Sequence, residues 1–478
     1  MMRMKCRQIA LGISLVLPPV LMGWVLCTDF PLGVCGNWVW NRNGEWNGAW
    51  TVQCGWILLC FGPAAWAAWH LHGKTGKRNI FLAGIILLCG IAGDWAVLRG
   101  GRAGLAENAL AVLNPFTTGY LNPVWTRQDV TRDFASKILQ VTDAAEVPAH
   151  RHVHPPMNVY LAEAAMHSPG KWGGGLLPGV RHEIEALQQA GALIPPLDTA
   201  EMAEAALKIL VLFLAGLELA KILLACMLWK MPAVRDAGAA FLAVAFGSNA
   251  AVLFCGHYDV FYFFITTLVL FCAGLAVRKP LWSFGAGVFA GTGSCFTLGF
   301  GVVGLVTSGM FVLQKNRLKL MAGVIAGGLL TAGCLMLAEV DLPAVLRKCW
   351  ENQKRFQTMT HKGYGIWAWW NIVDALLFCG VFPCLALCMK PGKGWSSMNK
   401  LWAILFGGWL FILFSGGVRG ELGRIGVLYL PVLLLAAGRF AGQGEKSFWT
   451  RLAVFAAIFL MFLQTVFLRE SLKLVLID

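Results

Sequence analysis

The chain has little charge for its length. Only 13% of its 478 residues are Asp, Glu, Lys or Arg, whereas 58% are hydrophobic, and the mean hydropathy is +0.65. A typical soluble domain carries about 25% charged residues. This scarcity of charge excludes an ordinary soluble protein and predicts an all-α polytopic membrane protein.

A disulfide framework is also lacking, although the chain has 15 cysteines. Most of them, such as Cys60 and Cys226, lie inside apolar runs, where cysteine acts as a small hydrophobic residue. Cys27, Cys35 and Cys54 are expected outside the membrane. Whether two of these three form a disulfide stays open, because no pairing can be read from the sequence.

Acidic residues are scarcer than basic ones, and the formal net charge is +14. This excess does not indicate a nucleic-acid partner, because a multispanning chain retains Lys and Arg in its short cytoplasmic loops. Basic residues in six turns agree with a multi-pass protein of the cell membrane whose N-terminus is cytoplasmic. These are Lys74/Lys77/Arg78, Lys230/Arg235, Arg278/Lys279, Lys315/Arg317/Lys319, Lys390/Lys393/Lys400 and Lys446/Arg451.

Apolar runs of about 20 residues predict membrane-spanning helices. The first run follows a basic N-terminus, and Leu26 is not a small cleavage residue, so we expect a retained signal anchor. About thirteen spans are predicted, at residues 9–27, 51–70, 79–98, 205–229, 237–255, 258–277, 281–294, 296–313, 318–338, 367–389, 400–416, 425–441 and 450–468.

Two long hydrophilic segments divide the chain and fall on the external side of this topology. The predicted division is 1–98 with helices 1–3, an external loop domain at 99–204, helices 4–9 at 205–338, an external loop at 339–366, and the C-terminal helices at 367–478. The first segment carries eight Lys/Arg against eleven Asp/Glu, which indicates a small domain. Within it, residues 130–141 have the spacing of a short amphipathic helix, either at the membrane interface or packed on other loops.

The sequence lacks a convincing internal repeat. Transporters are often built from repeated halves with ionisable residues near the bilayer midplane, so this absence disfavours a transporter. Instead, His257 and Asp259 interrupt an apolar stretch where one span is predicted to end and the next to begin. Ionisable side chains are costly in a bilayer and mark functional sites by default. The topology puts this pair at the external boundary.

Further polar clusters are predicted on the same external face. The first loop contains Asn114, Tyr120, Asp129 and Asp133, followed by His152 and His154; the second contains Lys354 and Arg355; a late turn contains Arg419, Glu421 and Arg424. Each cluster has an alternative: solvent-exposed histidines rather than a metal pair, interfacial anchors rather than a headgroup site, and a simple helix ion pair.

Four motifs in order carry a resemblance that extends over about residues 90–440. They are NPFTTGYL from Asn114, HVHPP from His152, GHYD ending at Asp259, and RGExxR at 419–424 with a proline seven residues later. This pattern resembles bacterial integral-membrane glycosyltransferases of the GT-C superfamily, and more loosely is similar to mannosyltransferases that use polyprenyl-phosphate-mannose. The chain departs from it in having two extra spans before the large loop and HPPM in place of HPPG.

The resemblance implies a GT-C-like helical bundle in a bacterial inner membrane, with a large external loop in its first half. It implies a polyprenyl-phosphate-linked sugar as donor and a glycan, lipid or protein as acceptor, with membrane lipids around the bundle. The catalytic carboxylate would be Asp129, or else Asp133 or Asp94, and Asp259 would lie beside the donor phosphate or a metal ion.

The same chemistry indicates the remaining roles. A base must accept the proton of the acceptor hydroxyl, and positive charge must stabilise the departing phosphate. Substrate binding would involve His257, Arg419, Glu421, Arg424, Tyr120, Asn114, Lys354 and Arg355, and a metal would be held by His152 and His154. Whether Mg²⁺ or Mn²⁺ takes part stays open. The alternative functions are a transporter or flippase of lipid-linked saccharides and a polysaccharide polymerase.

Overall fold

The protein is described by a computed structural model and is almost entirely helical. The model describes residues 2–27, 39–40, 48–71, 76–100, 104–113, 157–168, 182, 200–337, 340–359, 364–389, 397–415, 422–443 and 447–473. Within these ranges the strands are β1 (Val39–Trp40) and β2 (Leu472–Lys473), which pair antiparallel.

Six of the described helices are long and apolar enough to cross a membrane, and they confirm a polytopic helical membrane protein. They are α1 (Met2–Cys27), α3 (Lys77–Arg99), α9 (Ala200–Lys230), α12 (Asp259–Ala276), α15 (Arg317–Leu337) and α22 (Phe448–Ser471). A broken helix over residues 367–388 raises the number to seven if it counts as one span. Thirteen spans were expected, and the described residues do not confirm that number; several of the other predicted spans correspond to apolar helices of 10–17 residues.

The remaining elements coincide with the other predicted spans or lie in the hydrophilic segments. They are α2 (Gly48–His70), α4 (Gly104–Leu113), α7 (Met157–His167), α10 (Ala237–Ala245), α11 (Asn249–Leu253), α13 (Trp282–Ser294), α14 (Phe300–Val312), α16 (Leu342–Met359), α17 (Tyr364–Asp374), η2 (Ala375–Cys379), α18 (Val381–Cys388), α19 (Ser397–Phe414), α20 (Leu422–Ile425), η3 (Gly426–Leu428) and α21 (Leu430–Gly442). Gly380 has a φ of +89°, which residues with a side chain rarely adopt. At this residue the chain bends by 115°.

The chain divides into two compact units, each built from distant segments. Unit 1 comprises residues 1–104, 217–253 and 368–473, and unit 2 comprises 105–216, 254–367 and 474–478. The linear division predicted from the hydrophilic segments stays a prediction.

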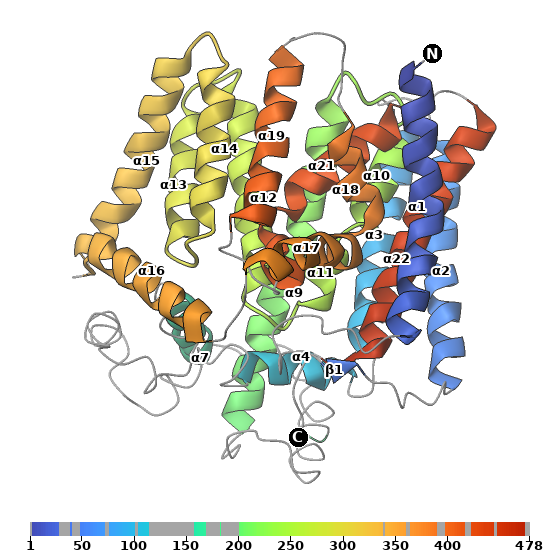
Figure 1. Cartoon of the computed structure of the whole chain (residues 1–478), viewed down its shortest axis with the longest axis horizontal. Helices are drawn as coiled ribbons and strands as arrows, with labels where there is room; N and C mark the ends of the chain where they lie inside the picture. The colour runs from blue at the N-terminus through green and yellow to red at the C-terminus, as the bar shows by residue number, and fades with distance from the viewer. Residues whose placement is uncertain are drawn as a thin grey trace. The chain divides into compact units, whose positions relative to one another are not determined.

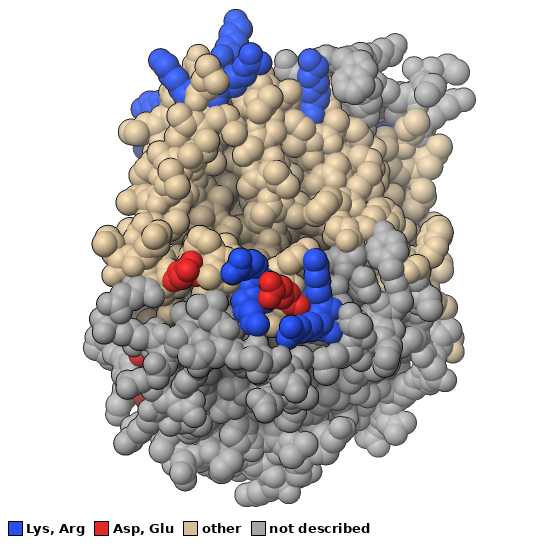
Figure 2. Space-filling model, turned by 60° about the vertical axis from the view of Figure 1, so that its left-hand side comes forward, with Lys and Arg blue, Asp and Glu red and all other residues tan. Residues whose placement is uncertain are grey.

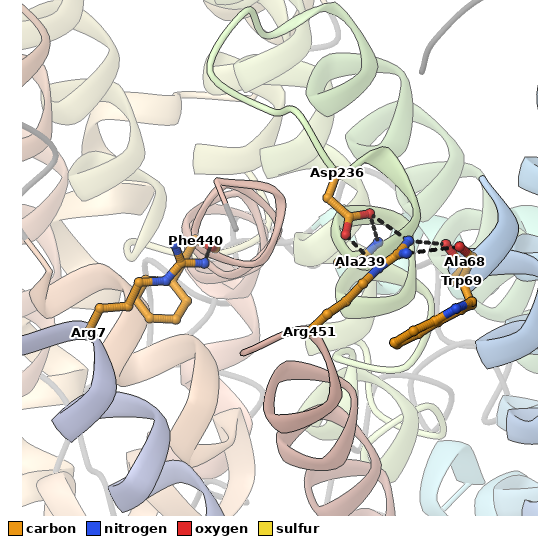
Figure 3. A network of polar contacts seen from close by, with 7 residues as sticks. All are labelled: Arg7, Ala68, Trp69, Asp236, Ala239, Phe440 and Arg451. Carbon is orange, nitrogen blue, oxygen red and sulfur yellow. Dashed lines mark hydrogen bonds and ion pairs between the residues drawn. The ribbon is translucent and has the colours of Figure 1, made fainter. Parts of the chain in front are cut away.

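Arginines hold several helix ends of unit 1 together (Figure 3). Arg451, at the start of α22, donates to the carbonyl oxygens of Ala68 and Trp69 at the end of α2, at 2.7 and 2.9 Å. Its Nε also pairs with Asp236 Oδ2 at 2.8 Å, and Asp236 caps α10. Arg7 of α1 donates to carbonyls in the last turn of α21. Cations beside helix C-termini are favoured because the last carbonyls lack partners within the helix. Basic residues of α1 and α22 therefore share one end of unit 1.

Four consecutive helices of unit 2, α12 to α15, stand side by side in Figure 1 and alternate in direction. Two basic turns, 277–281 and 313–316, therefore lie at one end of these helices. The turn at 295–299 and the start of α12 lie at the other end. The amphipathic helix α16 begins at this second end, where α15 ends, and runs away from α15 at an angle, towards α7 (Figure 1).

An apolar surface separates the charged ends of the molecule. On α15, Leu318, Leu329 and Leu337 are 81, 66 and 88% exposed. Figure 2 shows a broad uncharged belt with Lys and Arg gathered above it and a mixed cluster of basic and acidic residues along its lower edge. A continuous exposed apolar surface of this extent is expected where lipid surrounds a protein.

Candidate functional site

The GHYD turn occupies the entry to α12. His257 and Asp259 are 1 and 6% exposed, and Asp259 is the first residue of the helix. The His257 amide donates to the Phe254 carbonyl at 2.8 Å, and the two rings meet edge to face at 5.6 Å. The unpaired amides and the dipole at a helix N-terminus favour a negative charge. Asp259 is therefore accommodated in an apolar region by its place on the helix.

Helix α4, which ends directly before Asn114, packs closely against this turn. A Cβ at Gly256 would overlap the carbonyl oxygen of Asn108 and would lie 2.9 Å from the Cβ of Ala111. Asn108 and Ala111 are each 1% exposed. Glycine permits this approach because it has no Cβ. One flank of the loop that was predicted to be external is thus fixed beside His257 and Asp259.

Helix α7, which begins directly after the HVHPP motif, contacts the same region. The Asn158 amide is fully buried and donates to Tyr262 Oη at 3.4 Å and to the Phe296 carbonyl at 3.3 Å. Tyr262 lies one turn after Asp259 on α12, and residues three apart share one face of a helix. The Met157 amide donates to the Cys295 carbonyl at 3.3 Å. The second flank of the loop is thus also fixed beside the GHYD turn.

Helix α7 also contacts the start of α9. Lys208 donates to the Ser168 carbonyl at 2.9 Å and pairs with Glu204, one turn earlier on its own helix, at 3.3 Å. Partial burial, and secondarily the charge of Glu163, raise the pKa of the Tyr160 hydroxyl. Burial raises it because the charged phenolate is disfavoured away from water. The contacts with Lys208 extend the fixed part of the loop domain to the α9 span.

Residues 114–156 lie between α4 and α7 in the chain, and both of these helices contact residues at or near the GHYD turn. This segment contains six of the predicted site residues: Asn114, Tyr120, Asp129, Asp133, His152 and His154. All six lie outside the described residues, as does the amphipathic helix predicted at 130–141. The structure describes only the anchoring points of the segment that carries them.

Asp94, another predicted site residue, belongs to a different cluster. It is 2% exposed within α3 and forms an ion pair with Lys221 of α9, which is 1% exposed. Lys221 Nζ also lies 3.4 Å from Glu218 Oε1. Charges buried together in this way satisfy one another and carry a large desolvation cost. Asp94 is thus accommodated by a partner cation.

Helix α16 presents Lys354 and Arg355 on its surface. Both are exposed, and the Lys354 ammonium lies 5.2 Å from the centroid of the Trp350 ring. The opposite face buries Val345 and Cys349 completely. This is the pattern of an amphipathic helix. Whether its basic and aromatic residues are interfacial anchors or a headgroup site stays a prediction.

The remaining predicted residues lie in the turn before α20. Arg419 and Glu421 are outside the described residues. The backbone of Arg424 belongs to α20, but its side chain is outside them as well. Among the residues that the structure describes, no three of His, Cys, Asp and Glu form a group that would hold a metal ion.

Sequence reasoning missed Lys221, Glu218, Asn158 and Asn108. Lys221 and Glu218 carried a usable signal, because they are ionisable residues inside a predicted span. Asn158 follows the HPPM segment by one residue, but an asparagine in a loop domain does not stand out in a sequence. Its importance follows from contacts with residues more than 100 positions away.

Comparisons with models of protein families, with curated proteins and with solved structures found no match to this chain.

Proposed function

We propose that the protein is an integral-membrane glycosyltransferase of GT-C type, with about thirteen membrane helices. It would transfer a sugar from a polyprenyl-phosphate donor to a glycan, lipid or protein acceptor at the external face of a bacterial inner membrane. One observation carries the proposal: α4, which precedes residue 114, packs on the turn that holds His257 and Asp259, and α7, which follows residue 156, contacts Tyr262 one helical turn later and the 295–296 turn. Most of the residues that make these contacts are buried, and a transfer reaction of this kind must exclude water.

The roles follow from the chemistry of the transfer. Asp129, or Asp133 in its place, takes the proton from the acceptor hydroxyl, whose oxygen then attacks the anomeric carbon. The bond from that carbon to the phosphate oxygen breaks, and the phosphate departs with the electron pair. Arg419 and Arg424 stabilise the departing phosphate, Glu421 orients them, and His257 and Asp259 bind beside it. We do not assign the base to Asp94, because Asp94 is paired with Lys221.

Other predicted residues would act at the edges of this site. Lys354 and Arg355, which are exposed on α16, would attract the donor phosphate at the membrane surface. Asn114 and Tyr120 would contact the sugar, and His152 and His154 the acceptor or a divalent cation.

The test uses the purified full chain in lipid vesicles with a panel of polyprenyl-phosphate sugars. We expect donor consumption or transfer with at least one sugar, and a strong loss with Asp129→Asn. The assay is repeated with a chelator and with added Mg²⁺ or Mn²⁺ to measure metal dependence. A broad panel without turnover, from protein that is monodisperse and inserted, would contradict the proposal.

A transporter or flippase of lipid-linked saccharides is the second candidate, and two observations in unit 1 favour it. The helix over 367–388 is broken at Gly380, and broken helices form the substrate sites of many transporters. Ionisable residues inside the membrane also mark transport pathways, and Asp94, Glu218 and Lys221 are of this kind. A transporter would move a labelled lipid-linked sugar across the vesicle membrane and leave its glycosidic bond intact. A polymerase would instead lengthen the saccharide.

A further inference from the structure

A cluster of three ionisable side chains lies inside the helices of unit 1 and has no role in the proposed transfer. Asp94 comes from α3, and Glu218 and Lys221 come from adjacent turns of α9. Lys221 donates to both carboxylates, with 3.4 Å to Glu218 Oε1. The side chains of Asp94, Lys221 and Glu218 are 3, 2 and 12% exposed. We call this group the α3–α9 triad.

The triad is unbalanced in charge. If all three groups were ionised, two negative charges would share one positive charge, and the cluster would carry a net charge of −1. A net charge is expensive in a region of low dielectric, and a group there takes up or loses a proton instead. When two carboxylates share a site, one of them holds its proton more tightly than it would alone. A single added proton makes the triad neutral.

Among the described residues, Lys221 is the cation that acts on Asp94, and Glu218 is the other acid that does. The thiol of Cys60 on α2 also senses the charge of Asp94. Elsewhere on the helices packed against α3 and α9, the charged residues lie near helix ends. These are Asp236 and Arg451, which pair with each other, Arg469, which donates to the Gly100 carbonyl, and Arg439 and Glu470.

We propose that the α3–α9 triad as a whole binds one exchangeable proton beside the Lys221 ammonium. Glu218 is the route of exchange, because it is the most exposed of the three side chains. The proton leaves as the pH rises, and the cluster then carries an uncompensated negative charge. This proposal does not depend on the proposed glycosyl transfer and would hold equally for a transporter.

The chain offers a matched control on the same helix. Glu204 and Lys208 pair at 3.3 Å with one carboxylate for one ammonium. That pair is neutral when both groups are ionised and needs no added proton. The pair is somewhat more exposed than the triad, so a difference between the two clusters reports the second carboxylate together with the deeper burial of the triad.

The experiment is infrared spectroscopy of the full chain in lipid vesicles over a range of pH, in water and in deuterium oxide. A protonated carboxyl has a carbonyl stretch that is separate from the carboxylate bands and shifts in deuterium oxide. We expect wild-type protein to show such a band, which disappears as the pH rises. Glu218→Gln and Asp94→Asn should each remove one carboxyl from it, because the remaining acid and Lys221 form a neutral pair. Glu204→Gln should leave the band unchanged.

Removing the Lys221 ammonium should enlarge the protonated-carboxyl band instead of reducing it. In Lys221→Met two carboxyls must become neutral, so the band should gain about one carboxyl in area. Glu218→Gln and Asp94→Asn both retain a neutral ion pair, so they test the proposal even if Lys221→Met fails to fold. The proposal is overturned if wild-type protein lacks the band at every pH, or if Glu218→Gln and Asp94→Asn each leave its area unchanged.

Discussion

Asp94 and Asp259 are two buried carboxylates in apolar sequence, and the two units of the protein accommodate them in different ways. Asp94 lies within α3 and is paired with Lys221. Asp259 opens α12, where the helix N-terminus favours a negative charge. The first arrangement depends on a cation from a second helix, and the second places the carboxylate where the helix dipole favours it. We therefore expect Asp94 to matter for stability and Asp259 for function.

Removing the cation beside Asp94 is the strongest way to test this difference. Lys221→Met should cost about 3–5 kcal/mol, because it removes the cation of a buried ion pair and the carboxyls beside it must then be neutralised. Adding Asp94→Asn to this variant should restore part of the loss. Unfolding in detergent, followed for the two single variants and the double variant, measures the coupling. Additive effects would show that the pair does not stabilise the fold.

Asp259→Asn should separate function from stability. The asparagine retains the shape of the side chain, and loss of the interaction with the helix N-terminus costs only about 0.3–1 kcal/mol. Transfer should nevertheless fall by about 100-fold or more, as expected when a side chain of the reacting site is neutralised.

The control for this substitution is Asp341→Asn. Asp341 is also an acidic residue at a helix start in unit 2, where its Oδ1 accepts from the Ala344 amide at 3.1 Å. It is exposed and is not assigned to the site, so transfer should be unchanged. Equal activity of wild type and Asp259→Asn would remove the GHYD turn from the mechanism.

Gly256→Ala tests whether α4 must approach the GHYD turn closely. The new methyl group would overlap the Asn108 carbonyl, and overpacking of this kind costs about 1–3 kcal/mol. Gly304→Ala in α14 is the matched control, because nothing lies within 4 Å of the added Cβ. That substitution should stabilise the helix by about 0.5–1 kcal/mol. The same thermal shift in both variants would contradict the close approach.

Asn158→Ala should have the smallest effect. It removes two long hydrogen bonds, at 3.3 and 3.4 Å, and we expect a loss of about 1 kcal/mol. Ser168→Ala, also at the end of α7, removes a local hydrogen bond to Ala165 and should change stability less. Limited proteolysis of each variant, followed as cleavage at sites C-terminal to residue 156, would report whether α7 has detached. Wild-type resistance in Asn158→Ala would show that other contacts hold this flank.

The positions of the helices could be predicted from the sequence, because apolar runs of about 20 residues carry a strong signal. The break at Gly380 could not be predicted, because nothing in the sequence marks this glycine, one of 55, as having a positive φ. Asp94 and Asp259 both stood out as charges in apolar sequence. Their different settings could not be foreseen, because Lys221 is 127 positions from Asp94 and meets it only through helix packing.

The central claim concerns the site at the GHYD turn, and photo-crosslinking tests it most directly. The probe is a polyprenyl-phosphate sugar with a photoactivatable group on the sugar, and polyprenol without phosphate or sugar is the control. We predict crosslinks to residues 104–113, 157–168 and 254–262 that an unlabelled donor displaces. Crosslinks confined to the broken helix at 364–388 would contradict the account and favour a transporter.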